Sequence, residues 1–325
     1  MRKPLHLLPA LLAFTSAWAI PTWFPSSFTR PTPSSPEMVN YLHTEHLDIA
    51  DSIHETGTVQ CDTSRLVVHS WIPPHAAGTV FLVHGYYSQS GIWSEHIQRL
   101  LKKNLAVVTF DLPGHGLSDG GRMDADSFPQ YAAGLRAVED SMAGRAPKPW
   151  SLVGHSLGGG IVLDRAFHGS FPYSKVVLIA PMLRYQGWTW IGTVLPAVSA
   201  MKPYMVRKHV SLSSADTAFQ NRILTDPLEG WQTSTHWLKI VRTWNATLHP
   251  VDRPGVDWML LQGGLDQTID WNWGTTWLKA NIPGLQTRFL PLARHHVLNE
   301  AGATGVKSRE IFDAFLTRPL PNPPK

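Results

Sequence analysis

The sequence predicts an α/β protein built on a mostly parallel β-sheet, with helices packed on both faces of that sheet. Short and almost uninterrupted apolar segments alternate along the chain with segments whose apolar residues recur at helical spacing. Such apolar runs are typical of strands that are covered on both sides. The alternation stops after residue 181 and resumes near residue 254, so we expect one core, residues 37–181 and 254–318, interrupted by an insertion.

The elements of this core follow from local patterns. Residues 65–72 are rich in β-branched and aromatic side chains, which favours a strand, and Pro73-Pro74 ends it. Residues 91–103 carry apolar side chains at helical spacing, which predicts an amphipathic helix. The other predicted strands are residues 78–83, 105–110, 150–153, 175–179, 258–261 and 287–290, and the other predicted helices are residues 127–142, 159–167, 271–280 and 304–316.

The insertion, residues 182–253, differs in character from the core. It contains several helix-like stretches, no run typical of a buried strand, and many tryptophans. We therefore expect a helical cap that supplies an apolar pocket, with Trp188 and Trp190 as candidate substrate-binding residues. Apolar side chains at residues 188–195 precede basic ones, a combination typical of a surface that sits among lipid headgroups; the alternative is that they simply pack on the core. The basic residues are Lys202, Arg207 and Lys208.

The N-terminal segment has the features of a targeting sequence. Arg2 and Lys3 precede an apolar run at residues 7–20, and residues 17–19 (Ala-Trp-Ala) place small side chains at the two positions that signal peptidase recognises. The run is too short for a comfortable transmembrane helix. We therefore expect residues 1–20 to be a signal peptide or a short anchor of an exported or membrane-associated protein. The alternative is an apolar arm packed on the domain of a cytoplasmic protein.

Two further segments lie outside the core. Residues 21–36 mix five prolines with serine and threonine, which predicts an extended linker without a packing pattern. Residues 319–325 follow the last predicted helix and are expected to be a frayed tail.

Composition excludes several classes of function. Hydrophobic residues make up 43% of the chain, enough for a sizeable core, and the net charge of +4 is not gathered into a Lys/Arg run, so no nucleic-acid partner is expected. Cys61 is the single cysteine, which excludes an intramolecular disulfide and offers no metal-binding spacing. The sequence contains no dinucleotide fingerprint either, and we expect neither a metal nor a cofactor.

The stretch Gly154-His155-Ser156-Leu157-Gly158 is the strongest chemical signal. It follows a predicted buried strand and precedes a predicted helix, which is the context of a nucleophile elbow. Glycines allow backbones to pass closely at such a turn, and the serine is held at a helix N-terminus, which favours developing negative charge. We predict Ser156 to be a nucleophile; the alternative is a glycine-rich turn that carries an incidental serine.

A serine nucleophile needs a base and a group that orients the base. In this architecture the acid and then the histidine follow the serine along the chain, each after a strand. Asp266 lies nearer its strand end than Asp270 and is the preferred acid, although either could instead cap a helix. The base is one of the pair His295 and His296, since adjacent side chains point differently and only one can face Ser156.

Acyl transfer also requires hydrogen-bond donors for the oxyanion. The predicted donors are the backbone N–H groups of Leu157, directly after the nucleophile, and of Tyr86, after the strand that ends in His84-Gly85. The rings of Tyr86 and Tyr87 could instead line the pocket, and Tyr87 is a candidate substrate-binding residue. His155 is expected to be a packing residue.

Together these motifs resemble the α/β-hydrolase superfamily and, more narrowly, its monoglyceride-lipase and bacterial lysophospholipase branch, over roughly residues 60–317. The resemblance assigns the base to His295, because Glu300 follows it at the family's spacing of five residues. Tyr86 and Tyr87 depart from the family pattern, which has small residues there. The segments that carry the resemblance are His84-Gly85-Tyr86, Asp111 to Ser118, Gly154 to Gly158, Asp266 to Asp270, His295 to Glu300, and Asp226-Pro227 ahead of His236-Trp237.

The resemblance implies a serine hydrolase that cleaves the carboxylic ester of a lysophospholipid or monoacylglycerol through an acyl-enzyme. The partners expected are therefore a lipid ester and a peripheral membrane surface. The alternatives are a non-lipid esterase, thioesterase, acyltransferase or peptidase of the same fold, and a non-catalytic binding protein. A complete triad in the family's order argues against the last of these.

Overall fold

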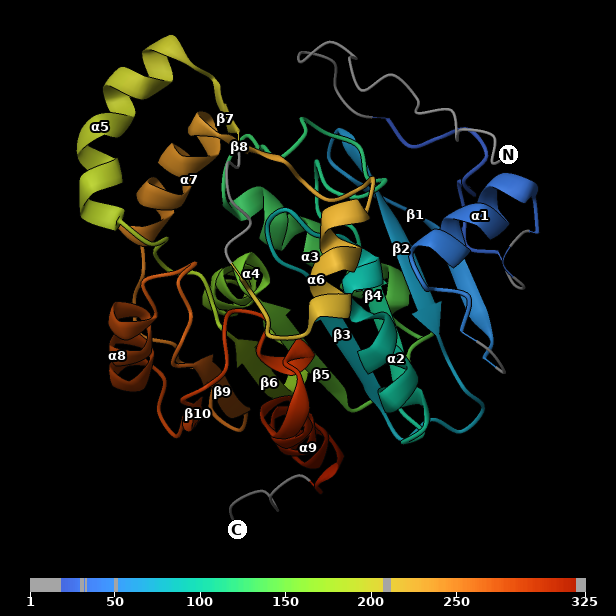
Figure 1. Ribbon diagram of the computed structural model, residues 1–325. Coiled ribbons are helices and arrows are strands. Elements are labelled where there is room, and N and C mark those ends of the chain that lie inside the picture. The colour runs from blue at the N-terminus through green and yellow to red at the C-terminus, as the bar shows by residue number, and fades with distance from the viewer. Residues whose placement is uncertain (1–18, 30–31, 33, 50–51, 207–211, 320–325) are drawn as a thin grey trace, which may run out of the picture.

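The computed structural model describes residues 19–29, 32, 34–49, 52–206 and 212–319. Most of the predicted targeting segment, residues 320–325 of the predicted tail, and Arg207 and Lys208 of the predicted basic group lie outside the described residues. The main sheet has eight strands in the order β1-β2-β4-β3-β5-β6-β9-β10 (Figure 1). Its strands are β1 (His54–Cys61), β2 (Ser64–Trp71), β3 (Thr79–Val83), β4 (Ala106–Phe110), β5 (Trp150–His155), β6 (Tyr173–Ile179), β9 (Asp257–Gly263) and β10 (Gln286–Leu290).

The sheet is parallel from β4 to β10, and only β2 runs antiparallel to its neighbours β1 and β4. The strands β3, β4 and β5 are buried at every position, as their continuous apolar sequences predict. The expected α/β fold with a mostly parallel sheet is confirmed. The helices that flank the core are α1 (Pro36–Thr44), η1 (Ser90–Trp93), α2 (Ser94–Leu101), α3 (Pro129–Met142), α4 (Leu157–Phe167), α8 (Trp271–Asn281), η2 (Val297–Asn299) and α9 (Gly302–Thr317).

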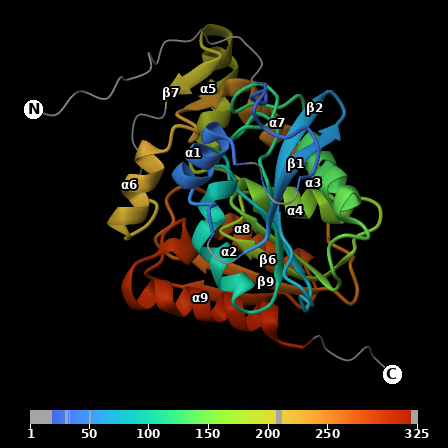
Figure 2. The same ribbon diagram turned by 90° about the vertical axis from the view of Figure 1, so that its right-hand side faces the viewer.

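Two helix pairs cover the sheet. In Figure 2, α2 and α9 lie on one side of the strands and α3 and α4 on the other. Arg99 on α2 pairs with Asp313 on α9 at 2.5 Å. Arg165 on α4 pairs with Glu139 on α3 at 2.6 Å, and both side chains are buried. A buried ion pair needs further hydrogen bonds to offset its desolvation, and the Glu139 carboxylate receives one from the hydroxyl of Tyr173.

The insertion between β6 and β9 forms a separate group of elements over one end of the sheet (Figure 1). Trp244 of the insertion contacts the core in two ways. The indole N–H of Trp244 donates to Asp164 at 2.8 Å, and the ring stacks on Phe128. The two short strands are a feature that the sequence did not predict, since each is only three residues long. The elements are α5 (Trp188–Met201), β7 (Tyr204–Val206), α6 (Thr217–Thr225), β8 (Gln232–Ser234) and α7 (Thr235–Asn245).

The N-terminal part of the fold differs from expectation in three places. The helix α1 is absent from the helices predicted from sequence. The strand β1 was not predicted, because its sequence is half polar and lacks a continuous apolar run. Residues 21–29 are packed rather than free: Phe24 is buried against Tyr41 and His69. The segment begins with a turn in which the Phe24 N–H donates to the Pro21 carbonyl at 3.0 Å, and its aromatic side chains Phe24 and Phe28 contact the core.

Candidate active site

Ser156 lies at a sharp turn between β5 and α4. Its backbone adopts φ 54° and ψ −118°, a conformation that non-glycine residues rarely take and that is found at nucleophile elbows. The flanking glycines are required, because a Cβ at Gly158 would lie 2.2 Å from the carbonyl oxygen of Val83 and one at Gly154 would lie 2.4 Å from that of Gly158. The strand–turn–helix context predicted from the sequence is therefore present.

Three side chains form a continuous chain of hydrogen bonds. The Ser156 hydroxyl donates to Nε2 of His295 at 2.9 Å, and Nδ1–H of His295 donates to Oδ2 of Asp266 at 2.7 Å. The three residues come from the ends of different strands, after β5, β9 and β10 respectively. All three are buried. The structure thus brings together the three residues proposed from sequence as nucleophile, acid and base.

The surroundings of Asp266 keep it ionised. Burial alone would raise its pKa, but the charge and hydrogen bond of His295 and the backbone N–H groups of Thr268 and Ile269 together lower the pKa below its usual value. A carboxylate at this position favours the Nδ1–H tautomer of His295, which leaves Nε2 able to accept the serine proton. Asp270, the rival acid, instead caps the N-terminus of α8 by accepting from the Trp273 N–H.

His296 occupies a different environment from His295. Its backbone N–H donates to the Ser213 carbonyl at 2.8 Å, and its ring packs against Phe219 and His155. The loop that carries both histidines is fixed by Glu300, whose carboxylate accepts from the backbone N–H groups of Arg294 and Ala215. This contact gives a physical reason for the spacing between His295 and Glu300.

His155 is a packing and positioning residue, as expected. Its Nε2–H donates to the carbonyl oxygen of His295 at 3.1 Å. Burial, and to a lesser extent the neighbouring His295, lowers the pKa of His155 to about 3, so its ring stays neutral. A neutral ring can hold the loop that carries His295 without placing a second charge beside it.

The backbone after β3 runs directly beside Ser156. A Cβ on Gly85 would lie 3.1 Å from the Cβ of Ser156, so only glycine fits without a shift. His84 holds this turn in place, because its Nδ1–H donates to the Gly85 carbonyl at 2.8 Å and its Nε2 accepts from the Leu112 N–H at 3.0 Å. Leu157 is the first residue of α4, where an N–H has no partner within the helix. Leu157 and the 85–86 turn therefore flank Ser156.

The two tyrosines after Gly85 reach from the core to the insertion. The ring of Tyr86 stacks on Trp237 with centroids 3.8 Å apart, and its hydroxyl accepts from the Ser234 N–H. The hydroxyl of Tyr87 bonds that of Thr233, and the Tyr87 carbonyl accepts from the Gly230 N–H. Bulky rings at these positions thus connect the turn beside Ser156 to the insertion.

An apolar cavity opens above Ser156 and His295. The core contributes residues that follow the carboxyl ends of strands, Tyr87 among them. The insertion contributes apolar side chains that were not predicted from the sequence to line the pocket, because nothing in a local pattern marks which face of a helix will meet a pocket. The insertion residues of this kind are Met182, Tyr185, Ile191, Met205, Ile223, Trp237 and Leu238.

The structure places Trp188 and Trp190 away from this cavity, unlike the expectation from sequence. Trp188 packs its ring against Tyr185 and against the guanidinium group of Arg242. Trp190 is 70% exposed. The two residues lie in the first turn of α5, and it is Ile191 on the same turn that faces the cavity.

Asp111 belongs to the support of the site. It is fully buried and accepts from the backbone and hydroxyl of Ser90 and from the Leu117 N–H.

Within the part of the chain that the structure describes, no group of three or more His, Cys, Asp or Glu residues is arranged to hold a metal ion.

Comparison with known proteins identifies the family. A family model described as serine aminopeptidase, S33, matches residues 74–302. The chain belongs to this α/β-hydrolase family. In curated sequences, human monoglyceride lipase is 25% identical over 247 residues, which cover 73% of this chain and 77% of that enzyme. Monoacylglycerol lipase of Mycolicibacterium smegmatis is 34% identical over 121 residues, 36% of this chain and 42% of the relative.

A solved structure shows the same fold. It is a soluble variant of monoglyceride lipase from Saccharomyces cerevisiae in complex with a substrate analog, with a TM-score of 0.70, 17% identity, and coverage of 82% of this chain and 97% of the other. The predicted membership of the α/β-hydrolase superfamily and of its monoglyceride-lipase branch is confirmed, and the chain is a hydrolase. The lysophospholipase part of the resemblance stays a prediction.

Proposed function

We propose that this hydrolase cleaves the ester bond of a monoacylglycerol through an acyl-enzyme formed on Ser156. The observation that carries the proposal is the unbroken chain of hydrogen bonds from Asp266 through His295 to Ser156 at the floor of an apolar cavity. An apolar cavity suits a fatty acyl chain, and the buried triad suits attack on the ester carbonyl.

The proposed mechanism gives each of these residues a role. His295 Nε2 takes the proton of Ser156 as its oxygen attacks the carbonyl carbon, and Asp266 stabilises the imidazolium that forms. The backbone N–H groups of Leu157 and Tyr86 are the proposed donors to the oxyanion, supported by the position of the 85–86 turn against Ser156. His295 then returns the proton to the leaving glycerol oxygen, and water releases the fatty acid by the reverse steps.

The charge of the cavity favours a neutral headgroup. Among its described lining residues there is no lysine or arginine, and the acidic lining residue Glu229 interacts with Arg122 and Arg222. A phosphate group would lack a cationic partner among the lining residues, whereas glycerol hydroxyls can bond to neutral polar groups. This favours a monoacylglycerol over a lysophospholipid.

A substrate panel tests the proposal. We expect hydrolysis of monoacylglycerol to exceed that of lysophosphatidylcholine, with p-nitrophenyl butyrate as a soluble ester that needs no headgroup contact. Release of fatty acid and p-nitrophenol is measured, and the Ser156→Ala variant provides the blank. Faster turnover of lysophosphatidylcholine would reassign the headgroup, and cleavage of an amino-acyl p-nitroanilide without ester hydrolysis would indicate a peptidase.

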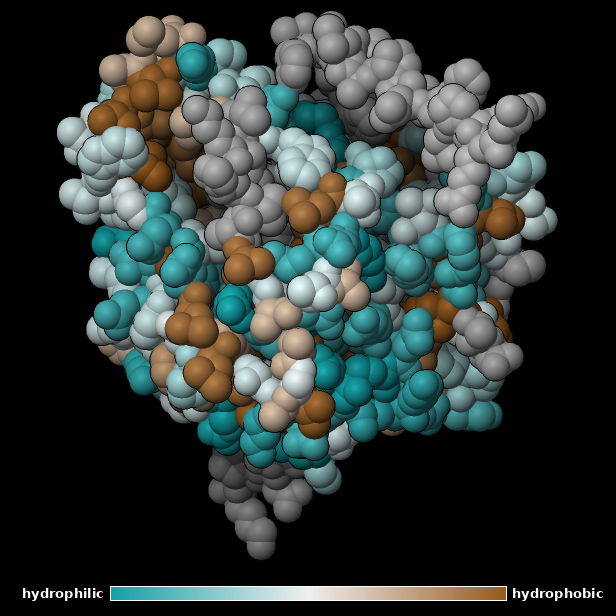
Figure 3. All heavy atoms as spheres, in the orientation of Figure 1, coloured by the Kyte–Doolittle hydropathy of each residue, from teal (hydrophilic) through white to brown (hydrophobic). Residues whose placement is uncertain are grey.

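We also propose that α5 brings the enzyme to a lipid surface. Only Leu195 of this helix is buried, its sequence carries no charged residue, and Trp190 and Met201 are 70% and 81% exposed. Figure 3 shows hydrophobic residues gathered over α5 at the upper left of the molecule. None of the helices in the described ranges is both long and apolar enough to span a bilayer. An exposed apolar face of this kind is typical of a peripheral contact with the headgroup region.

Vesicle binding measures this contact. Trp190→Ser is expected to weaken binding to phosphatidylglycerol-containing vesicles by roughly tenfold, because an indole ring at the interface is lost. Hydrolysis of p-nitrophenyl butyrate should be unchanged, since Trp190 lies outside the cavity. Val306→Ser on α9 is the matched control, an exposed apolar residue elsewhere that should leave vesicle binding unaltered. Equal binding by Trp190→Ser and wild type would exclude α5 as the contact.

The exported state is the remaining part of the proposal. A lipase that reaches its substrate at a membrane surface is compatible with export, and residues 1–19 carry the sequence features of a signal peptide.

A further inference from the structure

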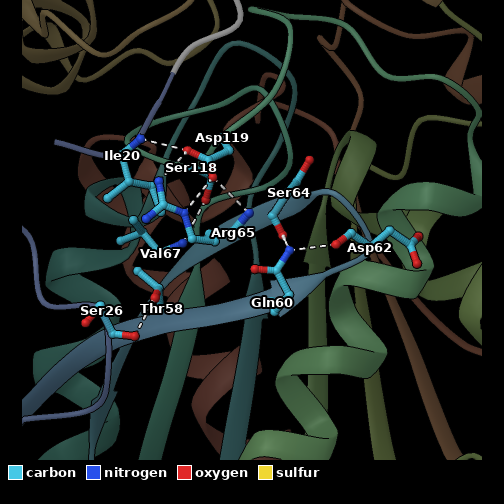
Figure 4. A network of polar contacts seen from close by, with 10 residues as sticks. All are labelled: Ile20, Ser26, Thr58, Gln60, Asp62, Ser64, Arg65, Val67, Ser118 and Asp119. Carbon is cyan, nitrogen blue, oxygen red and sulfur yellow. Dashed lines mark hydrogen bonds and ion pairs between the residues drawn. The ribbon is translucent and has the colours of Figure 1, made fainter. Parts of the chain in front are cut away.

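The backbone nitrogen of Ile20 contacts a carboxylate far along the chain. It lies 2.7 Å from Oδ1 of Asp119, which is 99 positions away (Figure 4). The side chain of Ile20 is only 7% exposed and belongs to the hydrophobic core cluster, whereas Ala19 directly before it is exposed. The chain therefore enters the folded domain at Ile20, with its nitrogen against an acidic group.

Asp119 accepts hydrogen bonds from Ile20 and Arg65. Oδ1 accepts from the Ile20 nitrogen at 2.7 Å and from Nη2 of Arg65 at 3.5 Å, and Oδ2 accepts from the backbone N–H of Arg65 at 3.1 Å and from its Nε at 2.9 Å. The Asp119 side chain is 16% exposed. Burial alone would raise its pKa, but hydrogen bonds from Arg65 and from the Ile20 nitrogen lower the pKa below its usual value. The carboxylate is thus ionised and can hold a cation on each oxygen.

The residues after Ile20 form an N-terminal strap, residues 20–29, along the outer strand of the sheet. The Ser26 carbonyl accepts from the Thr58 hydroxyl at 2.8 Å, as Figure 4 shows, and Thr29 forms a β-bridge with Thr56. A Cβ on Gly57 would lie 2.6 Å from the Phe28 nitrogen, so the strap lies tightly against β1. These contacts hold the start of the strap in one place and protect a strand edge.

We propose that the chain is cleaved between Ala19 and Ile20, and that the α-ammonium group released on Ile20 forms an ion pair with Asp119 that anchors the mature N-terminus. The cleavage is a hydrolysis by a signal peptidase. One water is added across the peptide bond, Ala19 leaves as a carboxylate, and Ile20 keeps the nitrogen, which is protonated at neutral pH. The proposal rests on the proposed export of the protein.

Sequence and structure point independently to the same bond. Ala17 and Ala19 are the small residues that signal peptidase recognises, and they place the cut directly before Ile20; Ala17 lies outside the described residues. The structure, without reference to that motif, places the nitrogen of Ile20 on a carboxylate. An amide nitrogen offers one N–H and no charge, whereas an ammonium group offers three and a positive charge, so cleavage converts an uncharged donor to the carboxylate into the cation of an ion pair.

The site of cleavage is tested on the full chain. Residues 1–325 are expressed with export to the periplasm of a bacterium, and the purified protein is examined by intact mass and N-terminal sequencing. We expect a protein that begins with Ile20. A mature protein that begins at any other residue, or one that keeps residues 1–19, would overturn the proposal.

The ion pair is tested on proteins with defined ends. A cleavable fusion yields one protein that begins at Ile20 and a second that begins at Ala19, which keeps the amide at Ile20. The Ile20 protein is expected to have a Tm about 2–4 °C higher at pH 6.5. In Asp119→Asn this difference should vanish, whereas in Asp62→Asn, the same exchange on the exposed turn after β1, it should remain. Equal Tm values for the two wild-type ends would overturn the proposal, even where Asp119→Asn does not fold.

The pH dependence of this difference has a defined sign. An α-amino group has a pKa of about 7.7–8.0 in an unfolded chain, and a carboxylate partner raises that pKa in the folded state. The extra stability is therefore fully present below pH ~7.7 and is lost as the pH rises through the folded value. The charged side chains at this site are Asp119 and Arg65, and neither changes its charge in that window. A difference that grows above pH 9 would contradict the ion pair.

The outcome is separate from that of the proposed function. If the mature protein begins at Ile20 and shows the Tm difference but has no lipase activity, the proposed substrate is contradicted and the proposed ion pair is supported. If the protein has full lipase activity but a different N-terminus, the proposed ion pair is contradicted and the proposed substrate is supported.

Discussion

Ser156→Ala is expected to lower kcat on p-nitrophenyl butyrate by on the order of 10⁵–10⁶-fold. The alanine removes the oxygen that attacks the carbonyl, and the hydrogen bond to His295 Nε2 at 2.9 Å is lost with it. The residual rate reflects the oxyanion donors and substrate binding alone. Steady-state kinetics measure kcat, and thermal unfolding checks that the fold is intact.

Ser213→Ala is the matched control for this variant. Ser213 also lines the cavity and is also buried, but its hydroxyl donates to Gln220 and not to a histidine. We expect it to keep most of its activity. A fluorophosphonate probe should label the wild type and Ser213→Ala but not Ser156→Ala. Labelling of Ser156→Ala at the wild-type level would reject Ser156 as the nucleophile.

His295→Ala is expected to lower kcat by a factor on the order of 10⁴–10⁶, because the serine hydroxyl then has no base within hydrogen-bond reach. His296→Ala tests the alternative assignment on the adjacent residue. The His296 ring packs on Phe219 and His155 and lies on the cavity wall, so its loss should cost less than about tenfold in kcat and act mainly on KM. The kinetics of both variants are measured with the same soluble ester.

The contrast between these two histidines is the decisive measurement. Full loss of activity in both variants, with unchanged Tm, would show that His296 contributes to chemistry. Loss in His296→Ala alone would reverse the roles. Because the rings of His295 and His296 both contact that of His155, thermal unfolding of each variant is needed to separate chemistry from packing.

The tyrosines beside Ser156 connect the core to the insertion. Tyr86 and Tyr87 lie on the turn that approaches Ser156; the Tyr86 ring stacks on Trp237, and the two tyrosine hydroxyls bond to Ser234 and Thr233 of the insertion. The family resemblance marked these residues only as a departure from small side chains.

Local sequence patterns determined the elements of the core and the order of its chemical groups. Apolar runs predicted the central strands, because a strand covered on both faces needs apolar side chains at every position. The glycines around Ser156 marked the turn, since their lack of a Cβ is visible in the sequence itself. The preference for Asp266 over Asp270 also followed from position alone, and Asp270 takes the capping role that was its alternative.

Only the tertiary structure decided which residues far apart in the sequence come into contact. Three features depend on which faces of separate elements pack together. They are the lining of the cavity, the exposure of Trp190 and the hydrogen bond between the Ile20 nitrogen and Asp119. Helical spacing shows that a helix has an apolar face but not which surface that face will meet. A contact between residues 99 positions apart leaves no trace in the residues next to either one, because it is set by the packing of the whole sheet and its connections.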